Sequence, residues 1–114
     1  MNAMHPDALE AKTARMHELG CLRSRHFAVP AMADSAMALM LSLLVGELQA
    51  TPVSDAALAV GNKLSREATD LMIDKLVSAE LAIVANHEED RRTVALTPLG
   101  SARMRSFVSG YPDV

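Results

Sequence analysis

Residues 51–100 read TPVSDAALAVGNKLSREATDLMIDKLVSAELAIVANHEEDRRTVALTPLG, and the middle of this stretch has a helical period. Ser65 is a good N-cap residue, because its hydroxyl can accept a hydrogen bond from the first turn of a helix. Around it, apolar residues recur at every fourth position: Leu64, Ala68, Met72 and Leu76. This spacing predicts a helix from Ser65 to about Ala79 with one buried face.

A shorter helix and a turn precede that helix. The segment SDAALAVG offers Ser54 or Asp55 as an N-cap, and Gly61-Asn62-Lys63 then interrupts the helical period. A short helix, a tight turn and a second helix in this order are the sequence form of a helix-turn-helix.

After the second helix the hydrophobic period becomes alternating. Apolar residues 81–85 lead to a polar tip at 86–90, and residues 93–96 are again mostly apolar, which predicts a β-hairpin. Thr97-Pro98 then places an N-cap before a proline at the first helical position. The pattern therefore predicts a final helix over residues 98–110.

These features resemble the winged helix-turn-helix domain of the MarR family of bacterial transcription regulators. The wing of that family runs Asp-x-Arg, a strand, and Leu-Thr-x-x-Gly. The matching segments here are Asp90-Arg91-Arg92 and Leu96-Thr97-Pro98-Leu99-Gly100. The resemblance implies a mainly α fold with a small β-hairpin wing, in which residues 1–114 form a single winged-helix domain.

The remaining segments take their expected roles from this resemblance. The helix-turn-helix and wing occupy 51–97, and Thr51-Pro52-Val53 supplies a short strand that pairs with the wing. Residues 34–50, capped by Asp34 or Ser35, are apolar almost all round, as in a helix buried on most faces. A helix over 7–19, stopped by Gly20, and the helix over 98–110 are expected to form a homodimer that spaces two DNA-reading heads ~34 Å apart.

The function implied is that of a dimeric transcription regulator that binds double-stranded DNA at a pseudo-palindromic operator. The helix after Ser65 would enter the major groove, and the wing would lie along the minor groove. Ser65 and Arg66 are expected to reach bases, and Arg92 or Arg91 the minor groove. The other expected DNA-binding residues are Lys63, Lys75 and Arg91 for phosphates, with Thr69 and Asp70 on the same helix.

An alternative is a winged-helix module that binds another protein and has lost or weakened DNA binding. Carboxylates at Glu67 and Asp70 flank the apolar Leu71 on the face expected to meet DNA, and carboxylates repel phosphate. Lys63 stands where a turn glycine is common in the family. A further alternative for Arg91 and Arg92 is that Asp90 and its neighbours pair with them to hold the hairpin.

Composition excludes several other classes. The chain has 114 residues, a net charge of −3 and one cysteine, Cys21, so it cannot form an intrachain disulfide. The resemblance leaves a redox role for this thiol open beside that of an ordinary thiol. No apolar run reaches the ~18 residues of a membrane helix, and no secretory signal is recognisable, so a cytoplasmic protein is expected. The four histidines have no metal-ligand spacing, and no catalytic motif is present, so neither a cofactor nor an enzyme activity is expected.

Overall fold

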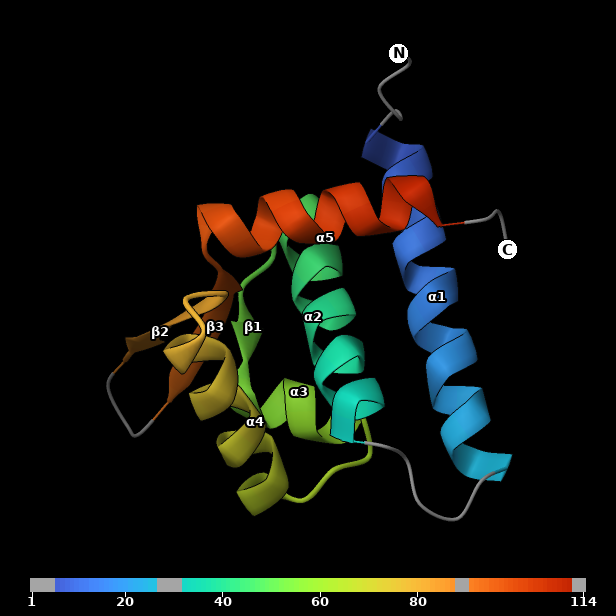
Figure 1. Ribbon diagram of the computed structural model, residues 1–114. Helices are drawn as coiled ribbons and strands as arrows, with labels where there is room; N and C mark the ends of the chain where they lie inside the picture. The colour runs from blue at the N-terminus through green and yellow to red at the C-terminus, as the bar shows by residue number, and fades with distance from the viewer. Residues whose placement is uncertain (1–5, 27–31, 88–90, 112–114) are drawn as a thin grey trace.

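The computed structural model describes residues 6–26, 32–87 and 91–111. In these ranges the chain is mainly helical and has one small antiparallel sheet (Figure 1). The elements, in chain order, are α1 (Pro6–His26), α2 (Met32–Leu48), β1 (Val53–Ser54), α3 (Asp55–Gly61), α4 (Arg66–Ser78), β2 (Ala82–Asn86), β3 (Arg92–Leu96) and α5 (Pro98–Gly110).

Helix α2 is the centre of the core. It lies between α1 and the sheet, and α5 crosses its end (Figure 1). Leu39, Leu43 and Leu44 are fully buried, as the apolar sequence of this helix predicted. Each such side chain contributes about 1.5–3 kcal/mol through burial. No helix in the described ranges is long and apolar enough to cross a membrane.

The limits of the first two helices differ from the prediction. Helix α1 does not stop at Gly20 but continues to His26, and α2 begins at Met32, ahead of the expected caps Asp34 and Ser35. A glycine inside a helix costs only about 1 kcal/mol relative to alanine, so it ends a helix only where the next residues favour another conformation. The segment after Gly20 contains neither proline nor a further glycine before His26.

Helices α2, α3 and α4 end in the same way. The residue after each C-cap has a positive φ without being glycine: Ala50 at 55°, Lys63 at 54° and Glu80 at 63°. In each case the next amide donates to a carbonyl five residues back, as Leu64 N does to Ala59 O at 2.9 Å. This is the Schellman arrangement, which glycine usually completes. The prediction that α2 extends to residue 50 is wrong because Ala50 has left the helical conformation.

The sheet has the strand order β1-β3-β2. Val53 of β1 is paired with Val94 of β3, and β2 is paired with β3 from Ala82↔Leu96 to Asn86↔Arg92. The prediction of a hairpin and of a short strand that pairs with it is therefore confirmed, although the strand is Val53–Ser54 and not Thr51-Pro52-Val53. Val94 and Leu96 face the core, while the hairpin projects from the body of the molecule beside α4 (Figure 1).

The LTPLG segment closes the hairpin against the end of α4. Thr97 caps α5 by accepting a hydrogen bond from Gly100 N at 3.0 Å, and its hydroxyl donates to Glu80 O at 2.6 Å. A Cβ atom at Gly100 would overlap the carbonyl oxygen of Leu81. The glycine is needed because the first turn of α5 packs directly on the backbone that follows α4.

Candidate nucleic-acid interface

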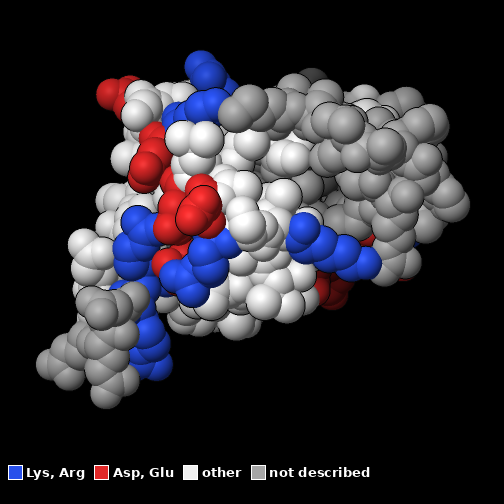
Figure 2. Space-filling view, turned by 90° about the horizontal axis from the view of Figure 1, so that it is seen from below, with Lys and Arg blue, Asp and Glu red and all other residues white. Residues whose placement is uncertain are grey.

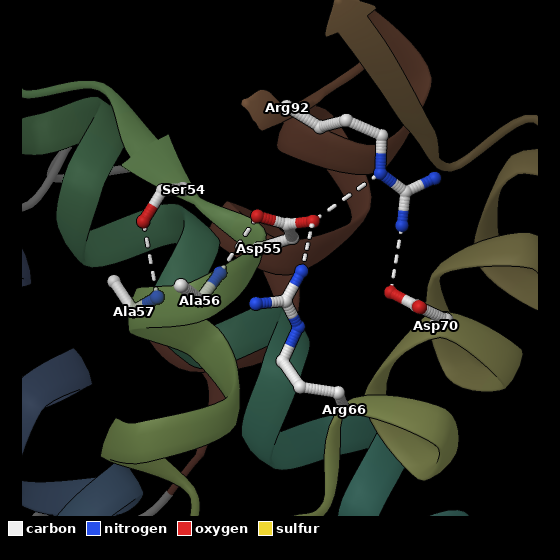
Figure 3. Close-up of polar contacts among 7 residues, drawn as sticks. All are labelled: Ser54, Asp55, Ala56, Ala57, Arg66, Asp70 and Arg92. Carbon is white, nitrogen blue, oxygen red and sulfur yellow. Dashed lines mark hydrogen bonds and ion pairs between the residues drawn. The ribbon is translucent and has the colours of Figure 1, made fainter. Parts of the chain in front are cut away.

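A buried carboxylate lies where α3, α4 and β3 meet. Asp55 is the first residue of α3, and Ser54, the N-cap, accepts a hydrogen bond from Ala57 N at 3.0 Å (Figure 3). One oxygen of Asp55 accepts from Ala56 N at 2.8 Å. This bond orients the carboxylate, so that its second oxygen points away from α3 toward two arginines (Figure 3).

Both arginines come from segments expected to read DNA. Arg66 Nη2, at the start of α4, lies 3.1 Å from Asp55 Oδ2, and Arg92 Nε, in β3, lies 3.3 Å from the same atom. Arg92 Nη2 also donates to Asp70 Oδ1 at 2.7 Å, which joins the hairpin to α4. We refer to Asp55, Arg66, Asp70 and Arg92 as the charge network.

The exposed fractions of the four side chains show which ion pairs of the charge network stabilise the fold. The side chain of Asp55 is only 6% exposed, and a buried carboxylate is costly unless cations and hydrogen-bond donors compensate it. Arg92 is 28% exposed, so its pairing with Asp55 is partly shielded from water. Arg66 is 59% and Asp70 44% exposed, and ion pairs in such positions contribute little to stability. Arg92 and Asp55 thus form the structural part of the network, and Arg66 and Asp70 its exposed edge.

The sequence offered Asp90 and its neighbours as partners of the arginines, and Asp90 lies outside the described residues. Among the described residues, Arg92 is paired with acids from two other elements, Asp55 and Asp70. The sequence marked Asp55 only as a possible helix cap, because nothing in a local pattern shows that three elements place their charges around it.

Thr69 is a correction to the predicted DNA-binding set. Its side chain is 0% exposed and therefore cannot reach a base in this conformation. The physical reason is helical geometry, because Thr69 shares a face with Met72, Ile73 and Leu76, all of them buried. Its Oγ1 atom is buried without a hydrogen-bond partner.

The other predicted residues lie at the surface of this region. Ser65 caps α4 by accepting from Ala68 N at 3.0 Å, so its hydroxyl is engaged in the helix. Lys63 is exposed in the turn before α4, and Lys75 is exposed in its last turn. Arg91 is exposed at the base of the hairpin tip. A surface hollow of about 480 Å³ is lined by Pro52, Ser54, Ala57, His87, Arg91, Arg92 and Thr93.

The charge of this face is mixed. In Figure 2, Lys and Arg side chains are interspersed with Asp and Glu side chains beside the hairpin. Helix α4 alone carries Arg66 and Lys75 against three carboxylates, of Glu67, Asp70 and Asp74. Non-specific attraction to a phosphate backbone is therefore weaker than for a uniformly basic helix.

Exposed apolar side chains lie in the same region. Leu71 of α4 is 51% exposed, between the turns that carry Glu67 and Asp74, and Ile83 of β2 is also exposed.

Cys21, whose role the sequence left open, lies in α1, and its side chain is outside the described part of the structure.

No protein-family model matches this chain, and no curated protein and no solved structure matches it either. The grounds for a functional assignment are thus the geometry of the charge network and its surroundings, together with the resemblance of the 51–100 segment.

Proposed function

We propose that the protein is a transcription regulator of the MarR type, which binds double-stranded DNA through a winged helix-turn-helix. The observation that carries this proposal is the contact between Arg92 Nη2 and Asp70 Oδ1, at 2.7 Å. It places an arginine of the hairpin beside the outward face of α4. A helix and a hairpin that present cations on one face can engage a major groove and the adjacent minor groove together.

In this proposal the start of α4 enters the major groove. Arg66 is the most exposed arginine of the charge network, and a long guanidinium side chain suits bidentate contacts to guanine. Lys63 and Lys75, at the two ends of the helix region, would contact phosphates. Arg91, at the base of the hairpin tip, would follow the minor groove.

Binding would exchange partners within the charge network. Arg92 would keep its bond to buried Asp55, which orients the guanidinium, and a phosphate oxygen would take the place of the half-exposed Asp70. The same exchange would release Arg66 from Asp55 toward a base. Because Arg66 and Asp70 are substantially exposed, loss of these two ion pairs should reduce the affinity only a little.

Assembly of two copies through α1 and α5 belongs to the same proposal. Leu99 and Phe107 of α5 are exposed, and so is Tyr111, the C-cap residue, whose ring centroid lies 5.6 Å from that of Phe107. A homodimer that buried these side chains would carry two α4 helices to a pseudo-palindromic operator. A regulator of this kind would act in the cytoplasm.

A second candidate is a winged-helix module that binds a protein. It is favoured by Leu71, which is exposed between carboxylates on the outward face of α4, together with exposed Ile83 on β2. An apolar side chain rimmed by charges suits a protein contact better than it suits phosphate.

The test of the first proposal is a selection of random-sequence duplexes by the purified protein, at about 50 mM and about 200 mM salt. Enrichment of palindromic sites with half-sites one turn apart supports a dimeric regulator. Arg92→Ala should then weaken binding to all sequences and reduce the salt slope by about 1, and Arg66→Ala should also relax specificity. Arg105→Ala removes the same charge from α5, where Arg105 is paired with Glu47, and should leave binding unchanged.

No retention of any duplex at the lower salt concentration would refute DNA binding. The second candidate would then be tested by Leu71→Ser, which should abolish capture of a protein partner without unfolding the chain.

A further inference from the structure

Three half-buried polar side chains join α1, α2 and the end of α3, away from the charge network. His17 Nε2 lies 2.7 Å from Asn62 Oδ1 and 3.0 Å from Ser42 Oγ. Asn62 Nδ2 lies 3.3 Å from Ser42 Oγ. We refer to His17, Ser42 and Asn62 as the polar cluster.

The hydrogen bonds of the polar cluster have one consistent arrangement of protons. Asn62 Nδ2 donates to Leu58 O at 2.9 Å, so the amide oxygen faces His17. An amide oxygen only accepts hydrogen bonds, and His17 Nε2 must therefore carry a proton. Ser42 Oγ donates to Ala38 O at 3.1 Å and accepts from Asn62 Nδ2, and the single Nε2 proton of His17 is shared between Asn62 Oδ1 and, at the longer distance, Ser42 Oγ. His17 is thus the donor that holds the Asn62 side chain from α1.

Asn62 lies where α3 ends and the turn toward α4 begins. It is the C-cap of α3, and its backbone amide donates to Leu58 O at 3.1 Å. Lys63 follows in the left-handed conformation, and Ser65, three residues after Asn62, caps α4. The side chain of Asn62 is therefore fixed to α1 and α2 at the point where the backbone turns toward α4.

We propose that His17 is a positioning residue for α4. By donating from Nε2 to Asn62, it fixes the turn between α3 and α4 relative to α1, and so sets the direction in which the start of α4 meets its target. The consequence for DNA binding rests on the proposed function. The effect on the turn itself does not, because it follows from hydrogen bonds within one chain.

The experiment compares amide hydrogen exchange in the native protein with that in His17→Leu and His17→Gln, measured by NMR. Exchange at Lys63 and Leu64, whose amides bond to Val60 O and Ala59 O, reports on the turn. His17→Leu should raise the exchange rates of these two amides about tenfold, because the turn loses the hydrogen bond that His17 donates to Asn62. His17→Gln, whose side-chain amide can donate from near the position of Nε2, should restore exchange to within about twofold of native.

Glu10→Ala is the matched control. Glu10 accepts from Gln49 Nε2 at 2.9 Å, so this substitution also removes a link from α1 but leaves the polar cluster intact. It should not alter exchange at Lys63 or Leu64. The positioning role is overturned if His17→Leu raises amide exchange equally at Leu43 and Leu44 of α2. It is also overturned if His17→Leu and His17→Gln show equal exchange at the turn.

Two further comparisons separate a failure of the positioning role from a failure of folding or of DNA binding. If His17→Leu does not fold, His17→Gln is compared with His17→Asn, whose shorter amide falls short of Asn62. Equal protection of the turn in both variants overturns the proposal. Binding of selected duplexes should weaken about tenfold in His17→Leu and recover in His17→Gln. If the native chain binds no duplex, the proposed function fails, while the exchange comparison still decides whether His17 positions the turn.

Discussion

Arg92 and Asp55 are separated by 37 residues in the chain, yet Arg92 Nε lies 3.3 Å from Asp55 Oδ2. This ion pair connects the hairpin to the first residue of α3, and the carboxylate is almost completely buried. Because a buried charge that loses its partner remains desolvated, the pair should matter more for stability than an ion pair of similar length at the surface.

A double-mutant cycle with Asp55→Ala and Arg92→Ala measures this interaction. We expect a coupling free energy of about 2 kcal/mol in chemical unfolding. The control is the cycle for Glu47 and Arg105, whose nitrogen and oxygen atoms are 2.8 Å apart but whose side chains are both substantially exposed. That coupling should be below about 1 kcal/mol. Equal coupling free energies in the two cycles would show that burial of Asp55 does not strengthen its interaction with Arg92.

Asp70 competes with phosphate for Arg92 in the proposed function. Asp70→Asn should therefore tighten DNA binding about five- to tenfold at low salt, since it reduces the ion pair with Arg92 Nη2 to at most a neutral hydrogen bond and removes a repulsive charge. Because Asp70 is half-exposed, stability should change little.

Asp74→Asn removes the same charge one turn further along α4 and is the control for net charge alone. If it tightens binding as much as Asp70→Asn does, release of Arg92 is not the cause. Fluorescence anisotropy with a selected duplex measures both variants.

Lys63 has a φ of 54°, which is unfavourable for a residue with a side chain. Lys63→Gly should raise the free energy of unfolding by about 0.5–1 kcal/mol. If the lysine contacts phosphate, the same change should weaken DNA binding and reduce the salt slope by about 1.

Glu80→Gly is the matched substitution, because Glu80 has a φ of 63° at the end of α4, opposite the start that would enter DNA. It should give a similar gain in stability without weaker DNA binding. If both variants bind DNA as tightly as the native protein does, Lys63 does not contact DNA.

Local patterns in the sequence were sufficient for most of the elements. The caps Ser65 and Thr97 were identified correctly, and Ser54 was one of two candidates for the cap of α3, because a cap depends on residues three positions apart in the chain. The apolar period of α4 likewise identified its buried face, although the list of DNA-binding residues placed Thr69, a member of that face, at the interface.

Contacts between distant elements could not be predicted in this way. No local pattern indicates that Asp55 receives both Arg66 and Arg92, because the positions of these residues follow from tertiary packing. The end of α2 was also poorly marked, since Ala50 completes a turn in which the sequence offers no glycine.

Gly100 tests the packing of the LTPLG segment. Gly100→Ala should destabilise the protein by about 3 kcal/mol or more, because the new Cβ atom would overlap Leu81 O and a backbone carbonyl cannot rotate aside. Gly110→Ala places the same methyl group in α5 where no atom lies within 4 Å, and it should be neutral or slightly stabilising. Thermal unfolding compares the two. A small effect at Gly100 would mean that α5 can move away from Leu81 without cost.

Thr69→Val tests both the burial of this residue and its removal from the DNA-binding set. The hydroxyl is buried without a hydrogen-bond partner, so its replacement by a methyl group should stabilise the protein by about 1 kcal/mol. Thr13→Val is the matched control, because Thr13 is equally buried in α1 but donates to Leu9 O at 2.7 Å. That change should instead cost about 1 kcal/mol. DNA affinity should be unchanged in Thr69→Val, and a large loss of affinity at native stability would return Thr69 to the interface.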